Sequence, residues 1–204
     1  MAPRVIQMLR GAVAELRIGD PLDYATDIGP VIDAEAREKL GAHKAEMAKQ
    51  AKTILDLPLP AALAHGTFVS PAAYELESIA SLKREVFGPV LHVVRFAGSR
   101  LAEVCSALNA TGFGLTLGLH TRIESTVNEI RSLVRVGNMY VNRNQIGAVV
   151  GAQPFGGEGL SGTGPKAGGA YYMHRFATER VCSTDTTASG GNAALMSMET
   201  VAKN

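Results

Sequence analysis

The chain has 204 residues, of which 46% are hydrophobic, and a formal net charge of +1. This size and composition allow a sizeable core in one or two domains. The near-neutral charge and the aromatic content of 5% argue against nucleic-acid binding, which needs a basic surface and stacking platforms. No apolar run is long enough to span a bilayer and the N-terminus has no signal pattern, so we expect a cytoplasmic protein without a membrane span.

The cysteines and histidines do not suggest a metal site. Cys105 and Cys182 lack metal-type spacing, and two cysteines in a chain of this length do not predict a disulfide framework. The five histidines include no pair spaced to face a metal from one helix.

Two helices are predicted in the first quarter of the chain. Apolar residues recur at helical spacing over residues 4–19, and the sequence Gly19-Asp20-Pro21 should end that helix. Asp33 is a credible N-cap for a second helix over residues 34–52, whose alternating charges suit a largely solvated surface.

From residue 68 onward the pattern alternates between strands and helices. Strands are predicted at 68–76, 90–96, 114–121 and 137–142, and helices at 99–108, capped by Ser99, and at 124–136. Such short alternating units predict an α/β fold with a parallel sheet and helices on its faces. A ligand site is then expected at the carboxyl ends of the strands, where the segment after Asn142 begins.

The end of the chain has a different character. Residues 175–187 resemble a last strand, and residues 188–204 contain little that would hold them in place. An edge strand followed by such a tail commonly reaches a neighbouring subunit, and fraying is the alternative.

A glycine-rich stretch, "PFGGEGLSGTGPKAGG", contains a literal G-x-G-x-x-G at Gly157, Gly159 and Gly162. A dinucleotide fingerprint needs a buried strand before it and a helix after it. Pro154 and Pro165 are unfavourable at those places, so we predict a glycine-rich surface loop.

Three segments, in this order, resemble the aldehyde dehydrogenase superfamily: "GDPLDYATDIGPVI", "REVFGPVLHVVRF" and "NRNQIGAVVGAQPFGGEGLSGTGPKAGG". The third looks like Δ1-pyrroline-5-carboxylate dehydrogenase. The stretch "GLTLGLHTRIESTVNEIRSLVRVGNMYVNRN", together with "TTASGGNAAL", resembles the C-terminal part of bacterial bifunctional proline utilisation proteins. The resemblance implies an incomplete three-layer, parallel-sheet catalytic domain over residues 1–176. It also implies an oligomerisation strand and tail over residues 177–204, and hence a homo-oligomer.

The implied reaction is the oxidation of L-glutamate γ-semialdehyde to glutamate with NAD, and a preceding proline dehydrogenase domain would use FAD. In the family a thiolate attacks the aldehyde, hydride passes to the nicotinamide, and a glutamate activates water. By resemblance, Glu85 of "EVFGP" holds the nicotinamide ribose hydroxyls and Phe87 packs beside them. Backbone N–H groups at Gly147 and Ala148 would hold the substrate's α-carboxylate, and Phe155 would wall its aliphatic part.

The family's nucleophilic cysteine, general base and nucleotide-binding domain precede the matched segments, so the chain alone is expected to be inactive and to need the preceding part of the enzyme. Cys105 lies in "CSAL", letters like those around the family's nucleophile, but its place in a helix favours a core thiol. Two other hypotheses remain: a non-catalytic assembly module that keeps the fold, and a thiol enzyme that uses Cys105.

Overall fold

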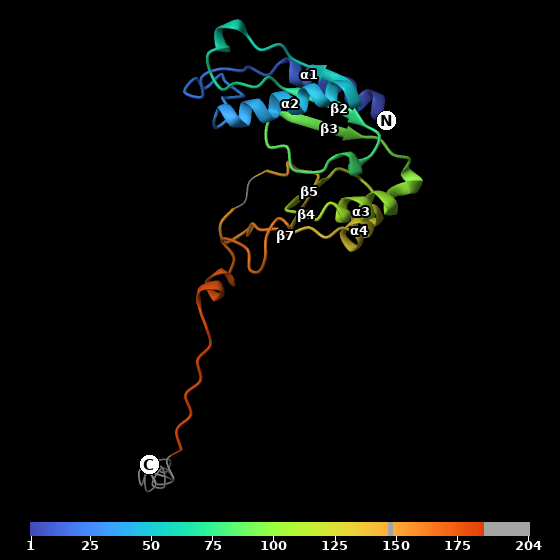
Figure 1. Cartoon of the computed structure of the whole chain (residues 1–204). Helices are drawn as coiled ribbons and strands as arrows, with labels where there is room; N and C mark the ends of the chain where they lie inside the picture. The colour runs from blue at the N-terminus through green and yellow to red at the C-terminus, as the bar shows by residue number, and fades with distance from the viewer. Residues whose placement is uncertain (147–148, 186–204) are drawn as a thin grey trace. The chain divides into compact units, whose positions relative to one another are not determined.

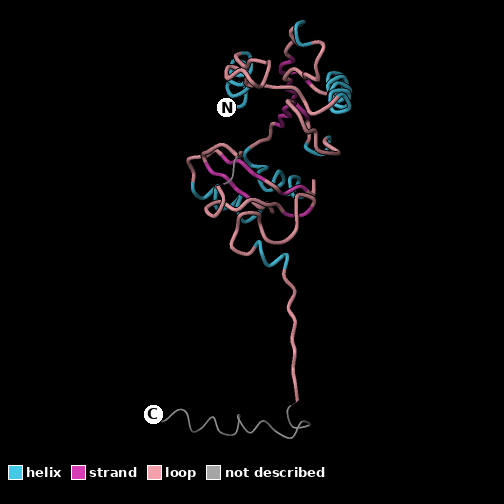
Figure 2. Tube along the Cα trace, turned by 90° about the vertical axis from the view of Figure 1, so that its left-hand side faces the viewer, coloured by secondary structure: helices cyan, strands magenta, loops and turns pink. Residues whose placement is uncertain are grey.

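A computed structural model describes residues 1–146 and 149–185 (Figure 1). The chain divides into two compact units, residues 1–147 with 156–163 and residues 148–155 with 164–204. Among the described residues, every α-helix and every strand lies in the first unit. Most of these elements are short and are joined by loops (Figure 2).

The first helix, α1, spans Ala2–Ala14 and ends earlier than predicted. The chain leaves the helix at Glu15 because Ile18 forms a parallel bridge with Ile28, and the Asp27 carboxylate accepts a hydrogen bond from the Arg17 N–H. No residue of α1 is buried.

The second helix, α2, spans Ala34–Gln50, and its predicted cap is confirmed because the Asp33 carboxylate accepts the Ala36 N–H at 2.7 Å. The helix is less solvated than predicted. Leu40, His43 and Met47 are buried along one face, at the i, i+3, i+7 spacing of a helical stripe.

The main sheet has the order β1–β2–β3. β1 (Lys52–Asp56) was not predicted and runs antiparallel to β2 (Ala72–Leu76), which runs parallel to β3 (Val90–Val94). β2 is the central strand, and its Tyr74 is 0% exposed. Helix α2 packs against β1 and β2, and Met47 joins Tyr74 in the core (Figure 1).

The second parallel pair forms as the sequence predicts. β5 (Thr116–Leu119) and β6 (Asn138–Val141) are parallel and are connected through α4 (Glu124–Leu133). They form a separate two-stranded sheet, so the parallel pairs do not join into one sheet.

Helix α3 (Leu101–Ala110) packs on α4. It follows the 3₁₀ turn Gly98–Arg100, which contains Ser99, so the prediction that Ser99 caps this helix is wrong. The N-cap is Arg100, and no side chain caps the helix.

The glycine-rich stretch has no Rossmann context. Gly159 lies in the two-residue strand β7 (Glu158–Gly159), which pairs antiparallel with β4 (Phe113–Gly114). Gly159 and Gly162 have φ values of +60° and +145°, and no helix follows them within the unit. The prediction of a glycine-rich loop is therefore confirmed.

Three further 3₁₀ turns complete the described secondary structure: η1 (Ala61–Leu63), η2 (Ile79–Ser81) and η4 (Tyr172–Phe176). Residues 177–185 form no strand in the structure, which corrects the prediction for this stretch. A strand needs a neighbour for its ladder of hydrogen bonds, and no strand of the described chain pairs with these residues. The remainder of the predicted strand and tail, 186–204, lies outside the described residues.

Candidate cofactor site

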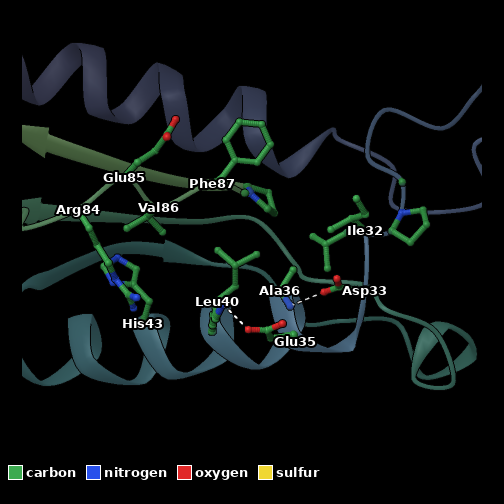
Figure 3. A pocket seen from close by; sticks show the side chains of 16 residues that line it. Ile32, Asp33, Glu35, Ala36, Leu40, His43, Arg84, Glu85, Val86 and Phe87 are labelled. Atoms are coloured by element: carbon green, nitrogen blue, oxygen red, sulfur yellow. Dashed lines mark hydrogen bonds and ion pairs between the residues drawn. The ribbon is translucent and has the colours of Figure 1, made fainter. Parts of the chain in front are cut away.

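A cavity of about 810 Å³ lies in the first unit, between the N-terminal part of α2 and the segment that leads into β3 (Figure 3). Two stretches of chain, 29–43 and 84–89, supply all of its lining. The segment 84–89 carries the "EVFGP" motif, so the structure brings Glu85 and Phe87 together in one cavity.

The two motif side chains are exposed. Phe87 is 87% exposed, so its ring is not part of the core that the described residues form. The Glu85 carboxylate is exposed and forms no hydrogen bond or ion pair with any residue of 1–146 or 149–185. An unpaired carboxylate can accept from two vicinal hydroxyls at once, and a free ring can pack against a sugar or a planar base.

The support behind these side chains comes from α2. A Cβ on Gly88 would lie 2.5 Å from Leu40 Cδ1, so the backbone of the motif rests directly on a buried helix side chain. Figure 3 shows Arg84 reaching toward His43 of α2, whereas Glu85 and Phe87 project from the other side of the segment. Alternation along an extended segment therefore directs Arg84 toward α2, and Glu85 and Phe87 away from it.

The opposite wall of the cavity combines charge with apolar surface. Glu35 and Lys39 form an i,i+4 ion pair on α2, and Asp33 is occupied as the helix cap. Ile32 is 93% exposed and supplies apolar area. The lining fits a nucleoside-sized group that has hydroxyls to donate and a flat apolar face to cover.

The sequence did not predict that α2 contributes to this site. The signal was present, since Leu40, His43 and Met47 interrupt an otherwise charged helix at core spacing. The pattern could not predict the partners of this face. Leu40 and His43 contact Gly88 and His92, which lie more than forty residues further along the chain.

The predicted substrate residues are Gly147, Ala148 and Phe155. Gly147 and Ala148 are outside the described residues. Phe155 is in the second unit, half-buried, and pairs with Ala167 through two backbone hydrogen bonds of 3.0 Å. Gly151 and Gly168 turn this small bridged loop with φ values of +80° and +70°.

The cysteines do not form a nucleophilic site within the described residues. Cys105 is 2% exposed on α3, and burial raises the pKa of its thiol, with the Glu129 charge adding to the effect. Such a thiol stays protonated and unreactive, which supports its assignment to the core. Cys182 is exposed in the stretch that has no regular secondary structure.

In the part of the chain that the structure describes, no three or more His, Cys, Asp or Glu residues gather as metal ligands. No helix there has the length and apolarity to cross a membrane.

Comparison with known proteins identifies the class. The model of the aldehyde dehydrogenase family matches residues 1–181, and the chain belongs to this family.

Two groups of relatives are most informative. The chain is 51% identical over 185 residues to the bifunctional protein PutA of Klebsiella aerogenes, covering 88% of this chain and 14% of that protein. It is 36% identical to 1-pyrroline-5-carboxylate dehydrogenase of Geobacillus kaustophilus, covering 83% of this chain and 32% of the relative. The chain thus spans a minor part of the length of these relatives.

Solved structures agree with these matches. A proline utilization A (PutA) variant from Bradyrhizobium japonicum superimposes with a TM-score of 0.85 at 53% identity, over 92% of this chain and 19% of that one. A 1-pyrroline-5-carboxylate dehydrogenase from Thermus with bound NAD gives a TM-score of 0.75 at 32% identity, over 84% of this chain and 33% of that one. The resemblance and the fold class predicted from the sequence are confirmed.

Proposed function

We propose that this chain supplies the nicotinamide-ribose and aldehyde contacts of an NAD-dependent dehydrogenase that oxidises L-glutamate γ-semialdehyde to glutamate in proline breakdown. The observation that carries the proposal is the pairing of an unengaged carboxylate, Glu85, with an exposed ring, Phe87, in one cavity. The names of the relatives support the choice of cofactor and substrate.

Each residue of the site has a distinct role in this proposal. Glu85 accepts hydrogen bonds from the two ribose hydroxyls and so fixes the ring that carries the nicotinamide. Phe87 covers one face of that ribose and excludes water from it. NAD, when bound, supplies the acceptor for the hydride.

On the substrate side, backbone N–H groups of Gly147 and Ala148 would receive the α-carboxylate, and Phe155 would contact the aliphatic carbons. The bridge between Phe155 and Ala167 fixes the backbone from which that ring projects, which supports a positioned wall.

The thiolate and the general base would come from residues outside these 204, as the family resemblance implies. Cys105 is buried with a raised pKa and belongs to the core. The chain alone would then be inactive, and its last residues would contribute to a cytoplasmic homo-oligomer. A proline dehydrogenase domain of the same protein would carry FAD.

The test of the cofactor role is steady-state kinetics on the full-length product of the gene that encodes these residues. Glu85→Gln should raise KM for NAD by about tenfold to a hundredfold, since two charge-assisted hydrogen bonds weaken together. Glu38→Gln, an exposed acid of α2 outside the cavity, is the matched control and should leave KM unchanged. Equal KM values for Glu85→Gln and the control would refute the cofactor assignment.

The substrate role has its own test in the same protein. Phe155→Ala should raise KM for glutamate γ-semialdehyde with little change in KM for NAD, because the ring would touch the substrate alone. Unchanged kinetics would refute the substrate assignment. Absence of any NAD-dependent aldehyde oxidation in the unmodified protein would favour the assembly-module hypothesis.

A further inference from the structure

Behind the cofactor cavity, two histidines from different elements lie against each other. His43 of α2 and His92 of β3 approach to 2.8 Å between their Nε2 atoms, with the ring planes at 72°. His43 is 7% exposed, and His92 is partly buried. One ring therefore donates an N–H to the lone pair of the other.

The contact has a limited capacity for protons. A neutral pair or a singly protonated pair keeps one lone pair at the contact, whereas two imidazolium ions would bring two N–H groups together. Burial lowers the pKa of both rings, and each has a nearby positive or potentially positive neighbour, Arg84 for His43 and His43 for His92. Glu46 acts in the opposite direction on His43, raising its pKa.

His43 lies on the same buried face of α2 that supports the motif segment. Leu40, one turn before His43, fills the space over Gly88. His92 lies in β3, which follows that segment directly. Helix α2 thus contacts this part of the chain at two places, Gly88 and His92.

We infer that His43 and His92 are positioning residues, which hold the Glu85–Phe87 segment in place for the nicotinamide ribose and release it when both rings are protonated. The cofactor part of the inference rests on the proposed function. The other part, that the His43–His92 contact holds the segment to α2 and so acts as a tether, rests on the packing alone. Double protonation would place two imidazolium charges beside Arg84, and repulsion would separate β3 from α2 at this point.

The tether can be tested without any cofactor, through the exposed trypsin sites Lys83 and Arg84. In the full-length product, His92→Phe removes the hydrogen bond, while His92→Gln keeps an amide that can still donate or accept. We expect cleavage at these sites, normalised to cleavage at exposed Arg122 in the same digest, to rise about fivefold in His92→Phe, the loss expected for one hydrogen bond. His92→Gln should stay close to wild type.

Equal normalised cleavage in wild type and His92→Phe would overturn the tether. A rise in both variants would also overturn it, because His92→Gln retains the polar contact. Normalising to Arg122 separates a local release from general unfolding, which would accelerate both sites together.

The second experiment measures the Kd for NAD in wild type and His92→Gln between about pH 8 and about pH 4.5. The series extends below the ordinary range of imidazole titration because burial lowers the pKa of both rings. Wild type should lose affinity toward acid by about fivefold more than His92→Gln, whose amide does not titrate. Parallel profiles would overturn the pH effect. Wild type could bind no NAD at any pH while His92→Phe is still cleaved faster than wild type. That result would support the His43–His92 tether and refute the cofactor assignment.

Discussion

Residues 84–89 and 156–162 are both glycine-containing segments of the first unit, and they are held by different kinds of contact. In the first, the space beside Gly88 is filled by the tip of the Leu40 side chain. In the second, backbone meets backbone: a Cβ on Gly157 would lie 2.6 Å from the Ser161 carbonyl oxygen and 2.9 Å from that of Gly114. A side-chain tip can rotate away, whereas a hydrogen-bonded carbonyl cannot move without disturbing its neighbours.

The difference suits the role that we propose for the first segment. The segment with the exposed carboxylate and ring rests on an adjustable side chain, and small movements there can accommodate a ligand. The glycine-rich segment instead fixes the start of β6 against residues 156–157, since Gly137 and Gly156 are in direct backbone contact. We therefore expect a substitution at the backbone contacts of the second segment, which include Gly137, to cost more than a comparable one in the first.

Gly137→Ala should have the largest effect. Its Cβ would lie 1.9 Å from the Gly156 carbonyl oxygen, so one of the two backbones must move. We expect a loss of about 3 kcal/mol or more in the free energy of unfolding, measured by urea denaturation. Gly98→Ala is the matched control because no atom lies within 4 Å of its Cβ position. Similar losses in the two variants would show that backbone contact does not decide the cost.

Gly88→Ala should cost less, about 1–3 kcal/mol, because its Cβ meets only the ends of Leu40. Leu40→Ala alone should cost about 2–5 kcal/mol, since it leaves a cavity under the segment. In the double variant the new methyl occupies part of that cavity, so the combined loss should be smaller than the sum by about 1 kcal/mol. Strict additivity would mean that the two residues do not share this space.

The two segments also differ in how far the sequence predicted them. The letters of "EVFGP" and of the glycine-rich stretch were sufficient to find both, and the positions of Pro154 and Pro165 in the sequence were sufficient to argue against a Rossmann turn. The helix at Asp33 and the strand–helix–strand unit ending at β6 followed from local patterns. Caps and periodicity are local properties, and these predictions succeeded for that reason.

What the sequence missed depends on distant contacts. β1 is five residues long with polar ends, and its strand character comes from pairing with the buried β2. The His43–His92 contact joins residues 49 apart, and no spacing rule indicates it. The failed strand at 177–185 has the right composition without a partner strand in the described chain, which shows that propensity alone does not form a ladder.

The histidine pair beside the first segment should make the free energy of unfolding depend on pH. The pKa values of His43 and His92 are lowered in the folded chain, chiefly by burial, from the ordinary value of 6.5. Below pH 6.5 the unfolded chain therefore binds more protons than the folded one, and the free energy of unfolding should fall as the pH drops. The stabilisation is fully present above that pH.

Urea denaturation at a series of pH values measures this slope. The double variant His43→Gln, His92→Gln should lose most of it, because neither amide titrates. Gly137→Ala should keep the slope while shifting the whole curve down, since the backbone contact carries no titratable group. A slope that persists in the double variant would assign the acid sensitivity to other groups.

The smallest effect is expected at Gly41, where a substitution can stabilise helix α2 without touching residues 84–89. Gly41 lies in the interior of α2 on the exposed side, and nothing lies within 4 Å of its Cβ position. Gly41→Ala should raise the free energy of unfolding by about 0.5–1 kcal/mol, since alanine loses less backbone entropy in a helix. A thermal melt measures the gain, and Gly98→Ala again serves as the control outside an α-helix. If stiffening α2 also lowers normalised trypsin cleavage at Lys83 and Arg84, then the helix and the motif segment move as one piece. A stabilised chain with unchanged cleavage would instead mean that the motif segment moves independently of the helix beneath it.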